Sequence, residues 1–180
     1  MATRAGQADG SATMTGASAE NLLARVTALL TAEAALLDRR RWHDWLSLYT
    51  EDGIFWAPAW AGDEAWTSDP QRQVSLIWAD RGNLAARIFR VEGGDSFASM
   101  PLPLTVHLVT GIAVTSVAEE TIEVQANWLV HSFLRISGTI LRAGRYEYRL
   151  RRAGADLKIA QKKIFIHDDP ITGAIDFYNI

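Results

Sequence analysis

The strongest constraint on the fold is a long stretch in the C-terminal half where nonpolar residues alternate with other residues. Its nonpolar members are Ile122, Val124, Ala126, Trp128, Val130, Leu134 and Ile136. Successive side chains of a β-strand point to opposite faces, so a period of two predicts a long strand with one packed face and one partly polar face. Residues 104–114 alternate in the same way, and residues 146–150 and 157–166 add two strands around a turn at Gly154.

Helical spacing dominates the N-terminal part instead. Leucine and valine recur at three- and four-residue steps, at Leu22, Leu23, Val26, Leu29, Leu30, Leu36 and Leu37. This spacing predicts a core-facing helix that starts at Ser18, whose hydroxyl can accept a hydrogen bond from an amide of the first turn. A second short helix would place Trp42, Trp45, Leu46 and Tyr49 on one face, with a turn at residues 50–53.

The middle of the chain is less regular. Residues 54–60 are rich in aromatic side chains, and Pro58 suits an edge strand or a bulge. Residues 74–78 fit either a strand or a short buried helix, and residues 84–91 fit one or two helical turns. Because helices come first and a long antiparallel meander follows, the predicted fold class is α+β. Long strands twist, so we expect a cone-like curved antiparallel sheet packed on the N-terminal helices.

Length and composition indicate a single domain. The chain has 180 residues, and residues 1–18 are mostly Ala, Gly, Ser and Thr. We expect residues 1–18 to form a disordered tail and residues 19–180 to form one domain. The sequence has no apolar run of membrane-spanning length and no apolar core of signal-peptide type, so the expected location is the cytoplasm.

Several functions are excluded or disfavoured by what the sequence lacks. It has no cysteine, which excludes disulfides, thiolate nucleophiles and cysteine-ligated iron–sulfur clusters in this chain. No phosphate-binding glycine loop and no GxSxG nucleophile motif occur. The C-terminal half is rich in Arg and Lys, but the net charge is −3, so the basic residues are interpreted as a solvated sheet face rather than a nucleic-acid site.

Histidine chemistry stays open as an alternative. The four histidines lie far apart in sequence, and no HxxxH or ExxH pair suggests a metal site. One His and one Asp enclosed by a cone-shaped sheet could move protons. The candidates are His107, His131 and Asn127 on strands, and Asp38 and Asp44 on or near the helices. His131 and Asn127 share parity with Glu123 and Gln125, which indicates a solvated face, and a structural role is the favoured interpretation of each histidine.

The seven tryptophans are Trp42, Trp45, Trp56, Trp60, Trp66, Trp78 and Trp128. Tryptophan fills cores, and it is also enriched at the centres of protein interfaces. The segment between Trp56 and Trp78 is too irregular to bury all of its rings by itself. Core packing therefore remains open for the tryptophans as a group, whereas the rings between Trp56 and Trp78 favour a subunit interface.

Three stretches resemble the small (β) subunit of aromatic-ring-hydroxylating dioxygenases. Residues 48–58 read Leu-Tyr-Thr-Glu-Asp-Gly-Ile-Phe-Trp-Ala-Pro, and residues 81–90 contain Arg-Gly-Asn-Leu and Arg-Ile-Phe-Arg. The ending combines Lys-Lys-Ile at 162–164 with Ile-Asp-Phe-Tyr-Asn-Ile at 175–180. Residues 58–60 and 68–71 are similar to the branch that acts on benzoate or anthranilate.

This resemblance implies a cone-like fold shared with nuclear transport factor 2 (NTF2) and scytalone dehydratase. It also implies a non-catalytic subunit that helps assemble an α3β3 hexamer, which dihydroxylates an aromatic substrate, with an aromatic acid favoured by the likeness to the benzoate and anthranilate branch. The Rieske [2Fe–2S] cluster and the mononuclear Fe(II) would lie in the large α subunit, with electrons from NADH through a reductase or ferredoxin. No catalytic, cofactor or metal residue is expected in this chain. The expected interface residues are Trp56, Trp60, Trp66, Trp78, Arg81, Arg87, Phe89 and Arg90. The alternative is a stand-alone, cofactor-less dehydratase or isomerase with a His/Asp pair.

Overall fold

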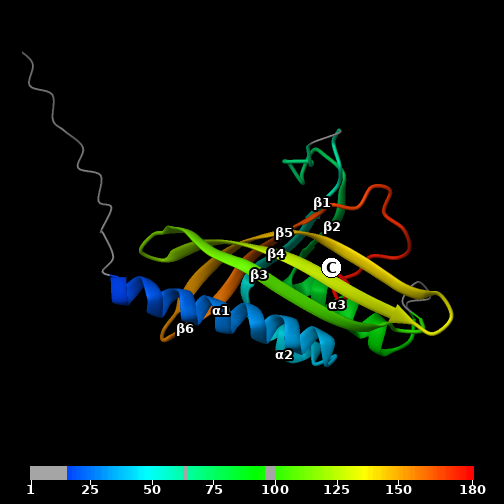
Figure 1. Cartoon of the computed structure of the whole chain (residues 1–180), viewed down its shortest axis with the longest axis horizontal. Coiled ribbons are helices and arrows are strands. Elements are labelled where there is room, and N and C mark those ends of the chain that lie inside the picture. Colours follow the sequence, from blue (N-terminus) through cyan, green and yellow to red (C-terminus); the bar gives the residue numbers. More distant parts are fainter. Residues whose placement is uncertain (1–15, 63–64, 96–99) are drawn as a thin grey trace, which may run out of the picture.

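The computed structural model of the chain describes residues 16–62, 65–95 and 100–180. Three helices and six strands follow one another in these segments (Figure 1). In chain order they are α1 (Gly16–Asp38), α2 (Trp42–Ser47), β1 (Tyr49–Pro58), β2 (Ser75–Asp80), α3 (Arg81–Glu92), β3 (Leu104–Val117), β4 (Thr121–Leu134), β5 (Gly138–Ala153) and β6 (Asp156–Ile166). The predicted α+β class is confirmed.

The six strands form one curved, unclosed sheet in the order β2-β1-β6-β5-β4-β3. All neighbouring pairs are antiparallel except β1 and β6, which are parallel, so the expectation of a wholly antiparallel sheet is wrong at this pair. The period of two tells which face a side chain occupies, but it carries no information about the direction of a distant strand. The three helices lie on one side of the sheet (Figure 1).

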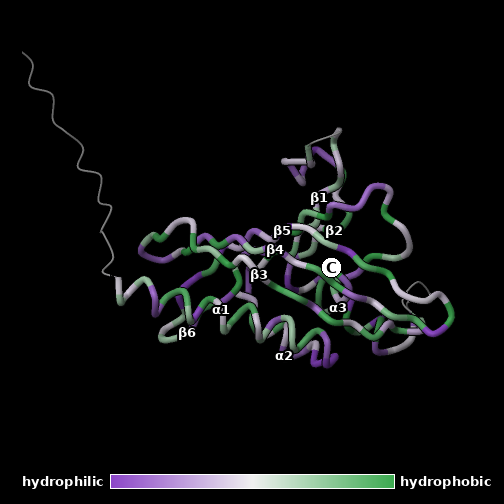
Figure 2. Tube along the Cα trace, in the orientation of Figure 1, coloured by the Kyte–Doolittle hydropathy of each residue, from purple (hydrophilic) through white to green (hydrophobic). Residues whose placement is uncertain are grey.

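The core lies between these helices and the concave face of the sheet. The α1 stripe buries Leu22, Val26, Leu30 and Leu37, and α1 packs against β3. On β4 every second side chain from Ile122 to Ser132 is buried, as the alternation predicts. Figure 2 shows the same alternation as repeated changes of colour along the strands. The nonpolar face of the helix and the nonpolar face of the strand therefore pack together in a single core.

Element boundaries differ from the expectations at several places. Helix α1 begins at Gly16, two residues before the expected start at Ser18, and residues 1–15 of the expected tail lie outside the described residues. Residues 50–53, expected as a turn, lie inside β1, where the register with β6 shifts between Tyr49 and Ile54. A Cβ atom at Gly53 would lie 2.9 Å from the carbonyl oxygen of Thr50, so this irregular stretch needs glycine.

The structure also decides between strand and helix for the two remaining segments of the middle region. Residues 75–80 form strand β2, and residues 81–92 form α3, which Asp80 caps by accepting a hydrogen bond from the amide of Asn83 at 2.7 Å. The register of β1 with β2 shifts between Ala57 and Pro58. Pro58 therefore marks a bulge and not an edge, because β1 has neighbours on both sides.

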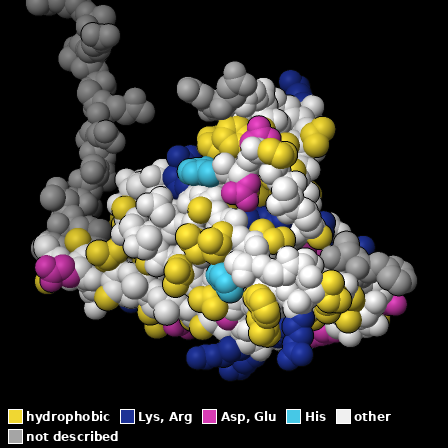
Figure 3. Space-filling view, turned by 45° about the vertical axis from the view of Figure 1, so that its right-hand side comes forward, with side chains coloured by type: hydrophobic (Ala, Val, Ile, Leu, Met, Phe, Trp, Pro, Cys, Tyr) yellow, Lys and Arg dark blue, Asp and Glu magenta, His cyan; other side chains and the backbone are white. Residues whose placement is uncertain are grey.

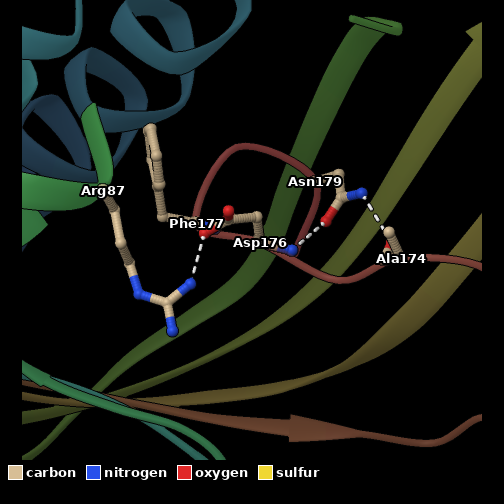
Figure 4. Close-up of polar contacts among 5 residues, drawn as sticks. All are labelled: Arg87, Ala174, Asp176, Phe177 and Asn179. Atoms are coloured by element: carbon tan, nitrogen blue, oxygen red, sulfur yellow. Dashed lines mark hydrogen bonds and ion pairs between the residues drawn. The ribbon is translucent and has the colours of Figure 1, made fainter. Parts of the chain in front are cut away.

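The chain after β6 returns to the helices and completes the core. The Phe177 ring stacks on Trp45 at 5.1 Å between centroids and meets Trp42 edge-on at 5.8 Å. Nearby, Arg87 of α3 forms an ion pair with Asp176 at 3.0 Å, and the Asn179 side chain accepts from the amide of Asp176 and donates to the carbonyl of Ala174 (Figure 4). These contacts fix the final segment against α2 and α3.

One charged pair lies fully inside this core. The Glu33 carboxylate accepts hydrogen bonds from Lys162 at 3.1 Å and from Tyr148 at 2.8 Å. Trp45 and Tyr49 also donate to it, both at 3.3 Å. Burial and the Glu33 carboxylate raise the pKa of Tyr148 and the pKa of Tyr49 well above the usual value for tyrosine. Both phenols therefore stay protonated and donate hydrogen bonds. We call these five residues the Glu33 cluster; it joins α1, α2, β1, β5 and β6.

Replacement of one charge in the Glu33 cluster should destabilise the fold strongly. In Lys162→Met the Glu33 carboxylate stays buried without its cation, which typically costs about 3–5 kcal/mol. The free energy of unfolding from urea denaturation measures this loss.

The neighbouring Lys163→Met is the matched control. Lys163 points to the other face of β6, where its ammonium lies 4.2 Å from the Trp56 ring centroid and is partly exposed. This variant should lose less than about 1 kcal/mol. Equal losses in the two variants would contradict the importance assigned to the buried pair.

Candidate functional site

The first candidate site is a histidine–aspartate pair between α1 and β3. His107 Nδ1 lies 2.6 Å from one carboxylate oxygen of Asp38, and the hydroxyl of Thr105 donates to that oxygen at 3.0 Å. The amide of His107 donates to the other oxygen at 3.0 Å. Burial by itself would raise the pKa of Asp38, but its hydrogen bonds with His107 and Thr105 hold that pKa below its usual value of 3.8.

This geometry orients the imidazole as a carboxylate does in acid–base catalysts. His107 is buried, and its Nε2 has no hydrogen-bond partner in the described part of the chain. Trp128 Nε1 and the Tyr146 hydroxyl are also buried without partners. Burial, followed by the charges of Glu33 and Asp38, raises the pKa of Tyr146, so the phenol stays protonated.

An aromatic ring and the Lys162 ammonium lie directly against Tyr146. The Trp128 ring stacks on Tyr146 at 5.2 Å, and the Lys162 ammonium lies 4.0 Å from the centroid of the same tyrosine. Trp128, Tyr146 and the Glu33 cluster thus lie in one part of the interior. The hydrogen bonds of Asp38 with Thr105 and His107 also have a structural role, because they join the end of α1 to β3.

The other acid–base candidates are not brought to this pair. His131 and Asn127 lie on the outer face of β4 with Glu123 and Gln125, which confirms the predicted solvated face. Asp44 is exposed and pairs with Arg41 at 2.7 Å. Within residues 16–62, 65–95 and 100–180, no group of three or more His, Cys, Asp or Glu side chains is placed to hold a metal ion.

The second candidate site is the surface that carries the tryptophans between β1 and β2. Trp56 and Trp78 are opposite each other in the β1–β2 register; Trp56 is buried, whereas Trp78 is 39% exposed. Trp60 and Trp66 stack at 4.3 Å. Their indole nitrogens donate to backbone carbonyls of Asp168 and Ile166, at 3.1 and 3.4 Å. Of these four rings, Trp78 is the one that presents a large exposed area.

Helix α3 follows β2 directly and packs on the core side of β1 and β2, whereas Trp78 lies on the opposite face of β2 from the buried Ile77 and Ala79. Phe89 is 72% exposed and Arg90 is exposed beside it. Arg81 forms an ion pair with Glu51 of β1, and Arg87 pairs with Asp176. The structure therefore brings the eight expected interface residues to two adjoining regions, around β1–β2 and α3, but several of them are engaged within the chain.

A further nonpolar surface lies on the outer face of the sheet. Leu104, Val106 and Leu108 of β3 are 64%, 49% and 55% exposed, and Leu141 of β5 is 58% exposed. Val106 and Leu141 both pair in register with His131, so they lie on the same face. The space-filling view shows groups of hydrophobic side chains on one face of the molecule (Figure 3). Sequence reasoning missed this patch, although exposed leucines at alternate positions of a strand are its signal.

Comparison with known proteins assigns the fold and the family. Helices packed on a curved, unclosed mixed sheet define an NTF2-like protein. The model for the ring-hydroxylating beta subunit matches residues 32–172, and the chain belongs to this family. It is 35% identical to benzoate 1,2-dioxygenase subunit beta of Acinetobacter baylyi over 157 residues, which cover 87% of this chain and 92% of that protein.

Two further relatives agree with this assignment. The 2-halobenzoate 1,2-dioxygenase small subunit of Burkholderia cepacia is 34% identical over 86% of this chain and 94% of its own length. The crystal structure of the benzoate 1,2-dioxygenase beta subunit of Burkholderia mallei superposes with a TM-score of 0.71 at 30% identity. That match covers 88% of this chain and 97% of the other. The resemblance read from the three sequence stretches is confirmed. No helix in the described segments is long and apolar enough to cross a membrane.

Asp38→Asn tests the structural role of the histidine–aspartate pair. Loss of the charged acceptor of three hydrogen bonds should lower the free energy of unfolding at pH 7 by about 1–3 kcal/mol. Because the folded pKa of Asp38 lies below 3.8, the carboxylate contributes its full stability above that pH and loses it as the pH falls through the folded value. The difference between wild type and variant should therefore shrink below about pH 4.

Urea denaturation at a series of pH values measures this difference. Asp44→Asn, at an exposed carboxylate of α2, is the control and should stay within about 0.5 kcal/mol of wild type. A difference between wild type and Asp38→Asn that is the same at pH 3 and pH 7 would contradict the assignment.

Proposed function

We propose that this chain is the non-catalytic β subunit of the terminal oxygenase component of an aromatic-ring dioxygenase. In this proposal three copies join three large α subunits in an α3β3 hexamer that dihydroxylates an aromatic acid. Support for the substrate class comes from the relatives, which are named for benzoate and 2-halobenzoate. The complex would lie in the cytoplasm, where NADH supplies electrons through a reductase or ferredoxin.

The proposal places the redox centres in the partner. A Rieske centre is held by two cysteines and two histidines, and this sequence contains no cysteine. The large subunit would therefore carry the [2Fe–2S] cluster and the mononuclear Fe(II). This chain would contribute surfaces that assemble the complex.

The observation that carries the proposal is the pair of exposed nonpolar surfaces. A subunit in a three-plus-three assembly meets more than one neighbour, and contiguous nonpolar surface on a folded chain marks places where partners bind. We propose that the large subunit contacts Trp78, Phe89 and Arg90, with Arg81 at the margin. The other four expected interface residues would support this surface indirectly, through their contacts within the chain; they are Trp56, Trp60, Trp66 and Arg87.

Reconstitution tests the proposed function directly. Mixing the purified chain with the large subunit encoded beside it should give a three-to-three complex by native mass spectrometry. Hydroxylation of the aromatic substrate should depend on this chain. A large subunit that assembles and hydroxylates equally well without the chain would overturn the proposal.

The Asp38–His107 geometry supports a second candidate, a dehydratase or isomerase that works alone. A carboxylate 2.6 Å from His107 Nδ1 could orient the ring to move a proton. Turnover by the isolated chain that His107→Ala abolishes would favour this candidate. Packing of Trp128 on Tyr146 in the interior favours the subunit proposal instead.

The double variant Trp78→Ala/Phe89→Ala tests the proposed contact with the large subunit. An aromatic anchor of an interface typically contributes about 2 kcal/mol or more, so loss of these two rings should raise the dissociation constant at least ~30-fold. Leu23→Ala on α1 is the control, since Leu23 is as exposed as Trp78 but lies on another element. Binding measured by calorimetry should be unchanged in the control. Equal affinity of wild type and double variant would remove these side chains from the interface.

A further inference from the structure

A pocket of about 380 Å³ lies beside the end of the β4–β5 hairpin. The hairpin, the residues that precede β3 and the final segment of the chain form its walls. Its nonpolar lining includes Pro101, Pro103, Leu134, Ile140 and Tyr178. The one charged side chain among the lining residues is Arg142 of β5.

Arg142 is unusual because its guanidinium is buried with few partners. The side chain is 1% exposed. One terminal nitrogen donates to the carbonyl of Thr172, whereas Nε and the other terminal nitrogen make no hydrogen bond to any residue that the structure describes. The nearest carboxylate oxygen, on Asp168, lies 3.9 Å from Nε, beyond hydrogen-bond distance.

The environment disfavours this charge. Burial lowers the pKa of Arg142, and the Asp168 carboxylate offsets only part of the effect. A buried N–H group without an acceptor costs about 1–3 kcal/mol, and more for a charged group. The hydrogen bond to the Thr172 carbonyl satisfies one guanidinium nitrogen and holds the final segment against β5. The other two nitrogens have no acceptor among the described residues.

A carboxylate is the acceptor that fits these nitrogens. The planar guanidinium has two edges with parallel N–H groups, and each edge joins one of these nitrogens to the terminal nitrogen that is bonded to Thr172, so a carboxylate can accept from either edge. The Asp168 side chain is 31% exposed, so it can turn toward solvent when another carboxylate takes its place beside Arg142. The nonpolar walls suit a ring or an aliphatic chain attached to that carboxylate.

We propose that this pocket binds a small organic carboxylate with a nonpolar body, and that Arg142 is its anion-binding residue. The pocket is built from one chain, so the proposal does not depend on the assembly described above. Because the site joins β4 and β5 to the final segment, its ligand would stabilise this end of the fold.

Benzoate and benzamide are the probes, since they share a ring and differ in charge. The full-length chain should bind benzoate in isothermal titration calorimetry, and benzoate should raise its thermal midpoint. Benzamide should bind at least tenfold more weakly, because it lacks the charge that Arg142 requires. Equal binding of the two probes, or no binding of benzoate, would overturn the proposal.

Two variants locate the binding to this pocket. Arg142→Gln should weaken benzoate binding at least tenfold, while Arg149→Gln, on the same strand but paired with Glu123 on the outer face, should leave it unchanged. Should Arg142→Gln fail to fold, Ala174→Phe keeps the arginine and places a ring in the pocket, where Ala174 is an exposed lining residue.

Ala174→Phe should therefore abolish benzoate binding while the fold persists. Wild-type affinity in either pocket variant would overturn the proposal. The proposal would also be wrong if Arg142→Gln weakened only the association with the large subunit and left benzoate binding intact, because Arg142 would then be an interface residue.

Discussion

The buried contact between Glu33 and Lys162 is the interaction on which the arrangement of the other elements depends. Glu33 comes from the helix that packs on the sheet, and Lys162 comes from the strand between β1 and β5. A buried ion pair is stable only when hydrogen bonds satisfy its remaining atoms, and Tyr148, Tyr49 and Trp45 supply them. The position of α1 and α2 along the sheet is thereby fixed by polar geometry, which hydrophobic packing alone does not specify.

The same contact explains how a fold that can enclose a substrate comes to act as a subunit. The polar groups of the Glu33 cluster bond to one another, and the Lys162 ammonium among them lies against the Tyr146 ring. The exposed nonpolar features of this chain lie on its outside: the ring of Trp78, the aromatic side chain of Phe89 and the nonpolar outer face of β3.

Much of this architecture could be predicted from local patterns, and the remainder depends on contacts between distant residues. The period of two identified β4 because alternate side chains from Ile122 onward are buried. The direction of β1 beside β6 and the meeting of Asp38 with His107 arise from pairings of residues far apart in sequence, which no local pattern encodes. The sequence does contain an indication of the buried ion pair, because Glu33 interrupts the nonpolar stripe between Leu30 and Leu37. An acidic residue at such a position requires a buried partner.

The stacked pair of Trp60 and Trp66 gives the loop between β1 and β2 an optical label of its own. Two indoles at 4.3 Å are close enough for their electronic transitions to couple, which produces a paired positive and negative band in ultraviolet circular dichroism. The rings of Trp45 and Trp128 stack on phenylalanine and tyrosine instead, so they absorb without such an indole neighbour. Loosening of this loop would therefore be visible spectroscopically while the rest of the molecule remained folded.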